Sequence, residues 1–178
     1  MAFSDVELAA LADLRVSLPA ISEWPPENPL SFVLMLAPRT KGKLGEALLE
    51  RLGLAAGATV GPAESVAYDK TVGGLRYEVK FSTEDPPRFQ QVRDPRLDER
   101  ALKYDFLVGI SARPEGLVYW RIPAADVGAL MDTGAITVQH AMSDTKWFTP
   151  SRTDSDACTP FRLTCAELVA ALAVSAQG

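Results

Sequence analysis

Three polar side chains close together in the chain have the types needed for metal-assisted hydrolysis. Eight residues separate Asp69 from the tripeptide Glu78-Val79-Lys80. Hard cations such as Mg²⁺ bind through one or two carboxylates together with water and phosphate oxygens. An ammonium on the same strand face as Glu78 can reach a phosphate or a metal-bound water. The pattern predicts a site for hydrolysis of a phosphate ester, provided that the fold brings Asp69 and Glu78 together.

A β-hairpin is the element that must position these side chains. Over residues 75–81 apolar and polar side chains alternate strictly, as a half-buried strand requires, and Gly73-Gly74 can take the positive φ angles of a tight turn. With a two-residue loop, Asp69 faces Glu78. Like charges facing each other destabilise a strand pair, and a cation between them removes that cost. A three-residue loop would instead send Asp69 to the other face and leave Glu78 on an ordinary solvated strand surface.

The spacing of these residues resembles the motif of the PD-(D/E)XK nuclease superfamily, which has the restriction-endonuclease-like fold. Tyr68 stands in place of the proline that gives the family its name. The resemblance spans about residues 44–123 and follows the order α-β-β-β-α-β: a helix with Glu46, the hairpin, a helical region with Gln90-Gln91, and further strands. Three segments resemble parts of small type II restriction enzymes and related phage nucleases: Phe89–Arg93, Tyr104–Ile110 and Val118–Pro123.

The resemblance implies an α/β (α+β) fold with a central mixed β-sheet flanked by helices. It also implies a metal-dependent endodeoxyribonuclease, similar to type II restriction enzymes, that cuts double-stranded DNA and leaves a 5′-phosphate. The implied cofactor is Mg²⁺, as one or two ions, with Mn²⁺ able to substitute. Cutting both strands of a palindrome would take a homodimer by symmetry. The implied catalytic residues are Asp69, Glu78, Lys80, Glu46 and Gln91, and the implied metal ligands are Asp69, Glu78, Glu46 and the main-chain carbonyl of Val79.

Two of these assignments have ordinary structural alternatives. Glu46 fits equally a surface glutamate near a helix N-terminus, where the helix dipole favours negative charge. Gln91 fits a polar helix face. For the whole chain, the alternatives are a catalytically inactive nuclease-fold protein that binds DNA or is structural, and an α+β interaction domain in which the pattern is accidental. A binding module has no need of two facing carboxylates, which favours the enzyme.

The composition is typical of a single globular domain, since the chain has 178 residues, of which 47% are hydrophobic and 23% charged. We expect one domain over 1–178, with a nuclease core at about 44–123, an N-terminal helical region at 1–38 and a C-terminal extension at 124–178. No apolar run is long enough to cross a bilayer. The N-terminus lacks the basic region of a secretory signal, so a cytoplasmic protein is expected.

The charge distribution bears on whether the protein binds nucleic acid, and the few Cys and His residues bear on whether it holds zinc. The net charge of −5 argues against a nucleic-acid partner at first. Residues 39–103, however, carry 12 Lys and Arg against 10 Asp and Glu, whereas the remaining residues carry 6 against 13. This excess of basic residues around the motif supports a DNA partner. The support is only modest, because an ordinary solvated surface can show the same small excess.

Cys158, Cys165 and the single histidine, His140, cannot form a structural zinc site. His140 has no evident triad partner and is expected to be structural or adjacent to substrate.

The remaining elements follow from capping signals and periodicity. Buried strands are expected at Tyr104–Ile110 and Leu117–Ile122, and a short strand at Ile136–His140. Residues 30–36 fit either a helix or a buried strand, and residues 143–156 are expected to form a loop. The first helix is expected to start at a capping box at Ser4 and to end before Pro19. A second is expected over Leu44–Leu52, preceded by a basic patch at Arg39–Lys43 and closed by Gly53. Further helices are expected over Arg88–Val92, Pro123–Met131 and Cys165–Val174, the last of them capped by Thr164.

Overall fold

The computed structural model describes residues 3–17, 24–25, 27–65, 67–97, 103–138, 145–150 and 156–174. Its helices are α1 (Asp5–Ser17), α2 (Pro38–Ala55), α3 (Ala124–Asp132) and α4 (Cys165–Val174), with short 3-10 helices at Pro95–Leu97 and Thr159–Phe161. Its strands are β1 (Val60–Pro62), β2 (Lys70–Val72), β3 (Leu75–Ser82), β4 (Phe89–Arg93), β5 (Phe106–Arg113), β6 (Gly116–Pro123), β7 (Ile136–Val138), β8 (Thr145–Phe148) and β9 (Arg162–Leu163). Among these described residues, no helix is long and apolar enough to cross a membrane.

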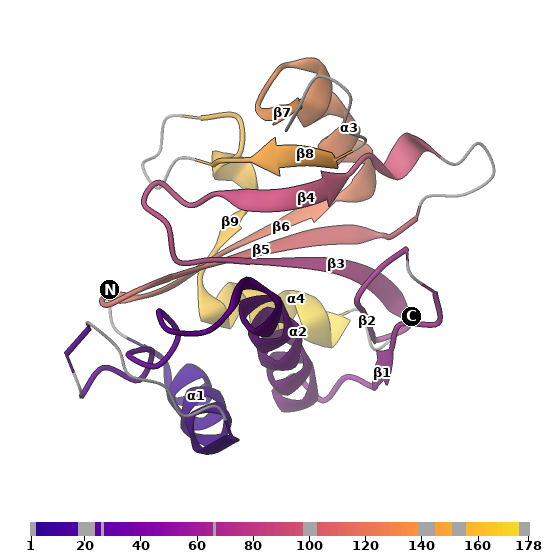
Figure 1. Cartoon of the computed structure of the whole chain (residues 1–178). Coiled ribbons are helices and arrows are strands. Elements are labelled where there is room, and N and C mark those ends of the chain that lie inside the picture. Colours follow the sequence, from indigo (N-terminus) through magenta and orange to yellow (C-terminus); the bar gives the residue numbers. More distant parts are fainter. Residues whose placement is uncertain are drawn as a thin grey trace.

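In the described part of the chain, two sheets and four α-helices form the layers of the fold. The larger sheet has the strand order β1-β2-β3-β5-β6-β9, and the smaller one has the order β4-β8-β7. Within the larger sheet β3 and β5 are parallel, whereas the other neighbours are antiparallel. Helices α1, α2 and α4 lie on one side of the larger sheet, and the smaller sheet and α3 lie on the other (Figure 1). The expected α+β fold, with a central mixed sheet flanked by helices, is confirmed.

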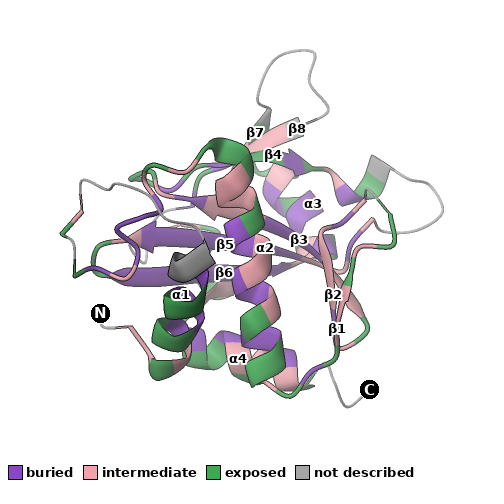
Figure 2. Cartoon of the chain, turned by 60° about the horizontal axis from the view of Figure 1, so that its bottom comes forward, coloured by how far each residue is buried: buried purple, intermediate pink, exposed green. Residues whose placement is uncertain are grey.

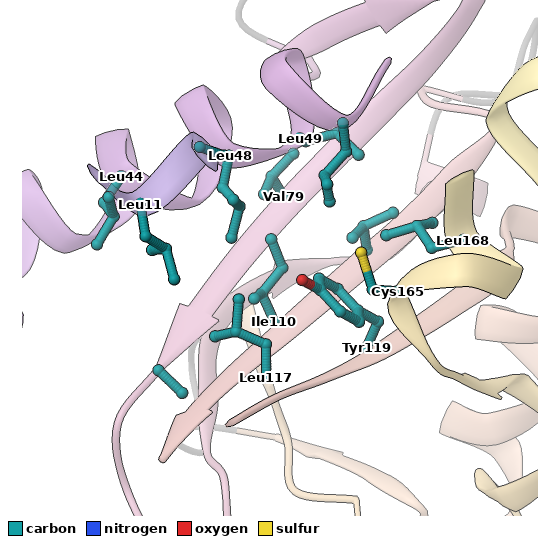
Figure 3. Packing of buried hydrophobic residues seen from close by; sticks show 14 of the residues in the cluster. Leu11, Leu44, Leu48, Leu49, Val79, Ile110, Leu117, Tyr119, Cys165 and Leu168 are labelled. Carbon is teal, nitrogen blue, oxygen red and sulfur yellow. The ribbon is translucent and has the colours of Figure 1, made fainter. Parts of the chain in front are cut away.

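Helix α2 is held against the sheet by its leucine stripe, as its periodicity predicts. Leu44, Leu48, Leu49 and Leu52 are fully buried. They belong to the same core cluster as Val79 of β3, and Figure 3 shows how Leu44, Leu48, Leu49 and Val79 converge with side chains of β5, β6 and α4. Figure 2 looks onto the helices from outside and shows exposed residues along α1, α2 and α4. One face of each helix is therefore buried against the sheet.

Helix α2 extends further in both directions than expected. The helix begins at Pro38, so the basic patch Arg39–Lys43 lies inside its first turns. At the other end, the helix continues to Ala55, so Gly53 lies within it instead of closing it. A Cβ atom on Gly53 would lie 2.8 Å from Cγ1 of Val72 in β2. Gly53 is therefore needed for close approach of the helix to the hairpin, which the local sequence could not reveal.

Two glycines of α2 give a matched test of this packing. Replacing Gly53 with alanine is expected to destabilise the fold by about 1–2 kcal/mol, because overpacking costs more than the helix gains from alanine. Replacing Gly42, where a Cβ meets nothing within 4 Å, should stabilise by up to about 1 kcal/mol. Chemical denaturation of the two variants measures both effects. Equal changes in the free energy of unfolding would contradict the packing role of Gly53.

The capping box predicted at Ser4 is present and also anchors α1 to the sheet. The Ser4 N–H and hydroxyl both donate to Oε2 of Glu7, each at 2.8 Å. Glu7 is only 3% exposed, and its Oε1 accepts a hydrogen bond of 2.8 Å from the hydroxyl of Tyr119 in β6. The helix ends at Ser17, before Pro19 as expected. A matching box, in which Thr164 pairs with Glu167, starts α4.

The helix expected at Arg88–Val92 is wrong, because this segment forms strand β4. Phe89 and Val92 are both fully buried, and β4 pairs with β8, which lies in the segment expected to be a loop. Their spacing of three residues resembles that of a helix. In the structure a β-bulge between Phe89 and Val92, with Gln91 at φ 57°, turns both side chains inward. Consequently no α-helix lies among the described residues between β3 and β5, which are 83–97 and 103–105, and α3 follows β6.

The other segments agree with expectation except one. Strands β5 and β6 pair as a buried antiparallel hairpin, α3 starts after Pro123, and β7 covers the described part of Ile136–His140. Residues 30–36 form neither a helix nor a strand but successive turns, in which the Val33 N–H donates to the Leu30 carbonyl at 2.9 Å. Leu30, Phe32 and Val33 are nevertheless buried.

Candidate active site

The hairpin forms with the register that the sequence predicts. Val72 pairs with Leu75, Thr71 with Arg76, and Lys70 with Tyr77, around Gly73 and Gly74 at φ 58° and 79°. The ladder ends at Lys70, so the next residue, Asp69, is not a paired strand residue.

Asp69 instead adjoins β3 through hydrogen bonds of its own. Its N–H donates to the carbonyl of Tyr77 at 2.9 Å, and its Oδ2 accepts from the N–H of Val79 at 2.7 Å. These two bonds fix the carboxylate against the middle of β3. Asp69 therefore lies beside Glu78, as the hairpin predicts, but one main-chain and one side-chain hydrogen bond, rather than the strand ladder, hold it there.

One face of β3 carries apolar side chains that pack in the core, and the other carries the charged side chains of the candidate site. Tyr77 and Val79 belong to the core beneath α2, whereas Glu78 and Lys80 alternate with them. The Nζ of Lys80 lies 2.6 Å from Oε1 of Glu78. Glu78 is only 5% exposed, which is more buried than a half-solvated strand face would predict. The structure thus places a largely buried Glu78–Lys80 ion pair beside Asp69, whose carboxylate accepts a hydrogen bond from the Val79 N–H.

Burial and mutual repulsion perturb the carboxylates of this group. Burial raises the pKa of the Glu78 carboxyl, the charge on Asp69 raises it further, and Lys80 opposes the shift. The pKa of Glu46 is also raised, first by burial and then by Asp69, while nearby lysines lower it. Asp69 therefore acts electrostatically on both glutamates, which means that this part of the molecule concentrates negative charge in a poorly solvated place.

The oxygen atoms near Asp69 suit a cation that retains several water ligands when it binds to a protein. In the part of the chain that the structure describes, no three His, Cys, Asp or Glu side chains are close enough to form a metal cage by themselves. Mg²⁺ does not need such a cage, because it binds through one or two carboxylates plus water and substrate phosphate. The carboxylates of Asp69 and Glu78 are oxygen donors of this kind, and the carboxylate of Glu46, whose pKa Asp69 also raises, lies close enough to Asp69 to be affected by its charge. The residues fit Mg²⁺ better than zinc.

A cleft of ≈ 550 Å³ opens where α2, β3 and β4 meet. It brings together most of the residues predicted for the site, although Glu78 does not line it. The loop between β3 and β4 and the first turns of α2 complete its walls. The lining residues are Pro38, Arg39, Lys41, Gly42, Glu46, Asp69, Val79, Lys80, Phe81, Ser82, Thr83, Glu84, Arg88, Gln90 and Gln91.

Several basic and hydroxyl side chains of the cleft were not assigned to the site from the sequence. The Nζ of Lys41 donates to Oγ1 of Thr83 at 3.3 Å, and partial burial lowers the pKa of Lys41 while Glu84 raises it. The hydroxyl of Ser82 accepts from the N–H groups of Glu84 and Arg88, each at 3.1 Å. Ser82 lies two residues after Lys80 and thus on its strand face, which is the signal that could have identified it.

The remaining predicted candidates have different outcomes. Gln91 lines the cleft, is exposed, and lies on a strand bulge rather than on a helix face. His140 lies outside the described residues, so its expected role stays a prediction. Cys158 and Cys165 are free and buried, and burial raises the pKa of the Cys158 thiol to about 12.

Glu78 is expected to reduce the stability of the metal-free protein. Since its pKa is raised in the folded chain, its contribution to stability is fully present below about pH 4 and is lost as the pH rises through the raised pKa. Glutamine imitates the protonated carboxyl. Glu78→Gln should therefore melt at a higher temperature than the wild type at pH 7 in EDTA, and the difference should vanish near pH 4.

Thermal denaturation at the two pH values checks this expectation. Glu50→Gln is the control, because Glu50 also pairs with a lysine, Lys70, at 2.7 Å but is more exposed. That variant should show no comparable gain. A lower melting temperature for Glu78→Gln at pH 7 would mean that the Lys80 ion pair outweighs the cost of burying the charge.

Comparisons with known proteins identify the fold but not a sequence family. No protein-family model and no curated protein sequence matches the chain. Among solved structures, the fold is similar to that of a bacterial homing endonuclease, I-Ssp6803I, with a TM-score of 0.51 and 15% sequence identity. The match covers 80% of this chain and 99% of that chain. At this level of identity the likeness shows a shared nuclease-like α+β fold.

Proposed function

We propose that the protein is a Mg²⁺-dependent endodeoxyribonuclease of the PD-(D/E)XK type, cutting double-stranded DNA in the manner of type II restriction enzymes. The observation that carries this proposal is the position of Asp69 and Lys80 on a cleft, with Glu78 buried beside them. The shared fold with a homing endonuclease supports DNA as the substrate. A single site of this kind cuts one strand, so double-strand cleavage would use two copies of the chain.

The carboxylates of Asp69 and Glu78, with the carbonyl of Val79 and the carboxylate of Glu46, would hold the metal. Bound Mg²⁺ supplies hydroxide near neutral pH and stabilises negative charge on the phosphate. The hydrogen bond from the Val79 N–H keeps the Asp69 carboxylate in place before substrate arrives. A fixed group of this kind needs little reorganisation during the reaction.

Lys80 is the residue that acts on the nucleophile and the phosphate. Its ammonium is held 2.6 Å from Glu78 and lines the cleft, so it can position the attacking water and offset the developing negative charge. Arg39, Lys41 and Arg88 line the same cleft and can contact neighbouring phosphates. Hydrolysis would leave a 5′-phosphate.

Cleavage of supercoiled plasmid DNA tests the proposal. Nicked and linear products are expected with Mg²⁺ or Mn²⁺ and none with EDTA. DNA binding without cleavage under any of these conditions would favour the alternative of a catalytically inactive nuclease-fold protein. If the protein neither binds nor cuts DNA, the nuclease assignment is rejected and an α+β interaction domain is favoured.

A further inference from the structure

The smaller sheet is free of acidic residues in a chain that is acidic overall. Its three strands have the sequences FQQVR, ITV and TKWF, which contain Arg93 and Lys146 but no Asp or Glu. The whole chain, in contrast, has 23 acids against 18 bases. Arg88 adds another cation just before β4. Lys146 pairs with the buried Val92, so Arg93 and Arg88 are the cations available on the opposite face, where they can contact the phosphates of a nucleic acid.

The two faces of this sheet differ in polarity. Its inner face consists of buried apolar side chains, Phe89, Val92, Ile136 and Phe148. Its outer face has exposed polar residues, Gln90, Gln91, Arg93 and Thr137. Trp147 precedes the inward-facing Phe148 and is contacted by the guanidinium of Arg88, 4.8 Å from the ring centroid. We call Arg88, Gln90, Gln91, Arg93, Thr137 and Trp147 the outer face of the smaller sheet.

The β-bulge makes this outer face continuous with the cleft. Phe89 pairs with Phe148 and Val92 with Lys146, so two residues of β4, Gln90 and Gln91, lie opposite one residue of β8. In a regular strand their side chains would point to opposite faces. Here both are exposed and both line the cleft. A bulge that re-aims side chains in this way is typical of positions next to an active site.

The backbone of Gln91 is a second indication that its side chain is used. Its φ of 57° is the one positive value at a non-glycine position among the described residues. Glycine would take this conformation at no steric cost. Strained positions of this kind cluster at ligand contacts.

We propose that the outer face of the smaller sheet reads base edges of duplex DNA next to the scissile phosphate, with Gln91 as a base-contacting residue. This inference rests on the proposed nuclease function. Antiparallel β-strands enter DNA grooves in known readers, and a glutamine amide can bond to N6 and N7 of adenine in the major groove. Arg88, which packs on Trp147, contacts the DNA backbone and contributes affinity that does not depend on sequence.

A binding selection that needs no cleavage tests this proposal. The parent is the full chain carrying Lys80→Ala, assayed in EDTA so that it binds DNA without cutting it, and the probe is a pool of randomised duplexes. Gln91→Gly, added to this parent, keeps the positive φ and removes only the amide side chain. The parent should retain duplexes with adenine preferred at one position. Gln91→Gly should reduce that preference about tenfold.

Two arginine variants separate sequence reading from electrostatic attraction. Arg88→Ala should weaken binding to all duplexes similarly, without changing the preferred sequence. Arg51→Ala is the control, because Arg51 is an equally exposed arginine that pairs with Asp13 at 2.5 Å and does not line the cleft. It should change neither affinity nor preference by more than about twofold.

The outcomes distinguish this inference from the nuclease assignment. A parent that shows no sequence preference, or a Gln91→Gly variant that retains the parent's preference, would overturn the reading surface even if the wild type cuts plasmid DNA. A preference that disappears with Gln91→Gly would support the surface, even in a protein that never cuts DNA and whose nuclease assignment therefore fails.

Discussion

Replacing Lys80 with alanine is expected to slow plasmid cleavage about a hundred- to a thousandfold while leaving the fold intact. The substitution removes the ammonium that positions water and offsets charge on the phosphate. Its side chain is 18% exposed and points away from the leucine core, so no packing is lost. The loss should appear in kcat more than in KM, because the interaction is strongest in the transition state. Single-turnover cleavage at saturating enzyme measures it.

Lys70 provides a matched control for Lys80. Its side chain is also 18% exposed and pairs with a carboxylate, that of Glu50, at 2.7 Å, yet it does not line the cleft. Lys70→Ala should lower cleavage by less than about tenfold, an effect of the size expected for a lost phosphate contact. Equal losses in the two variants would show that general charge, and not the position of Lys80, supports the reaction.

Replacing Asp69 with asparagine is expected to reduce cleavage about a thousandfold or more at physiological Mg²⁺ concentration. Asparagine keeps an oxygen that can accept the hydrogen bond from Val79, so the hairpin should survive. It lacks the negative charge needed to hold the cation. Loss of that charge should also lower the pKa values of Glu46 and Glu78, since Asp69 raises both. Titration calorimetry with Mg²⁺, beside cleavage assays, separates weak metal binding from slow chemistry.

Asp105 is the corresponding control for Asp69. Its Oδ2 accepts a hydrogen bond of 2.7 Å from the N–H of Arg76, another residue of β3, in the way that Asp69 accepts from Val79. It also pairs with the guanidinium of Arg76 but does not line the cleft. Asp105→Asn should reduce stability without changing the Mg²⁺ dependence of cleavage. If Asp69→Asn cut DNA at the wild-type rate, Asp69 could not be a metal ligand.

The local sequence was sufficient for elements whose stability depends on near neighbours. The glycine pair and the strict alternation of β3 determined the hairpin and its register, because a one-residue slip would exchange the apolar and polar faces of the strand. The capping box at Ser4 and the helix cap at Thr164 were predictable for the same reason, since the bonds that each of them makes join residues three positions apart. Asp69, Glu78 and Lys80 could be grouped from the sequence because a single hairpin positions all three.

Only the tertiary structure decided the features that depend on residues far apart in the chain. Strand β4 exists because β8, more than fifty residues later, pairs with it, and the bulge makes a helix-like spacing of Phe89 and Val92 fit a strand. Pairing of this kind overrides local preference. The burial of Glu78 and the cleft between α2, β3 and β4 likewise arise from packing of separate elements. The local sequence therefore determines that Asp69, Glu78 and Lys80 lie together, whereas the burial of Glu78 and the shape of the cleft depend on contacts between residues far apart in the chain.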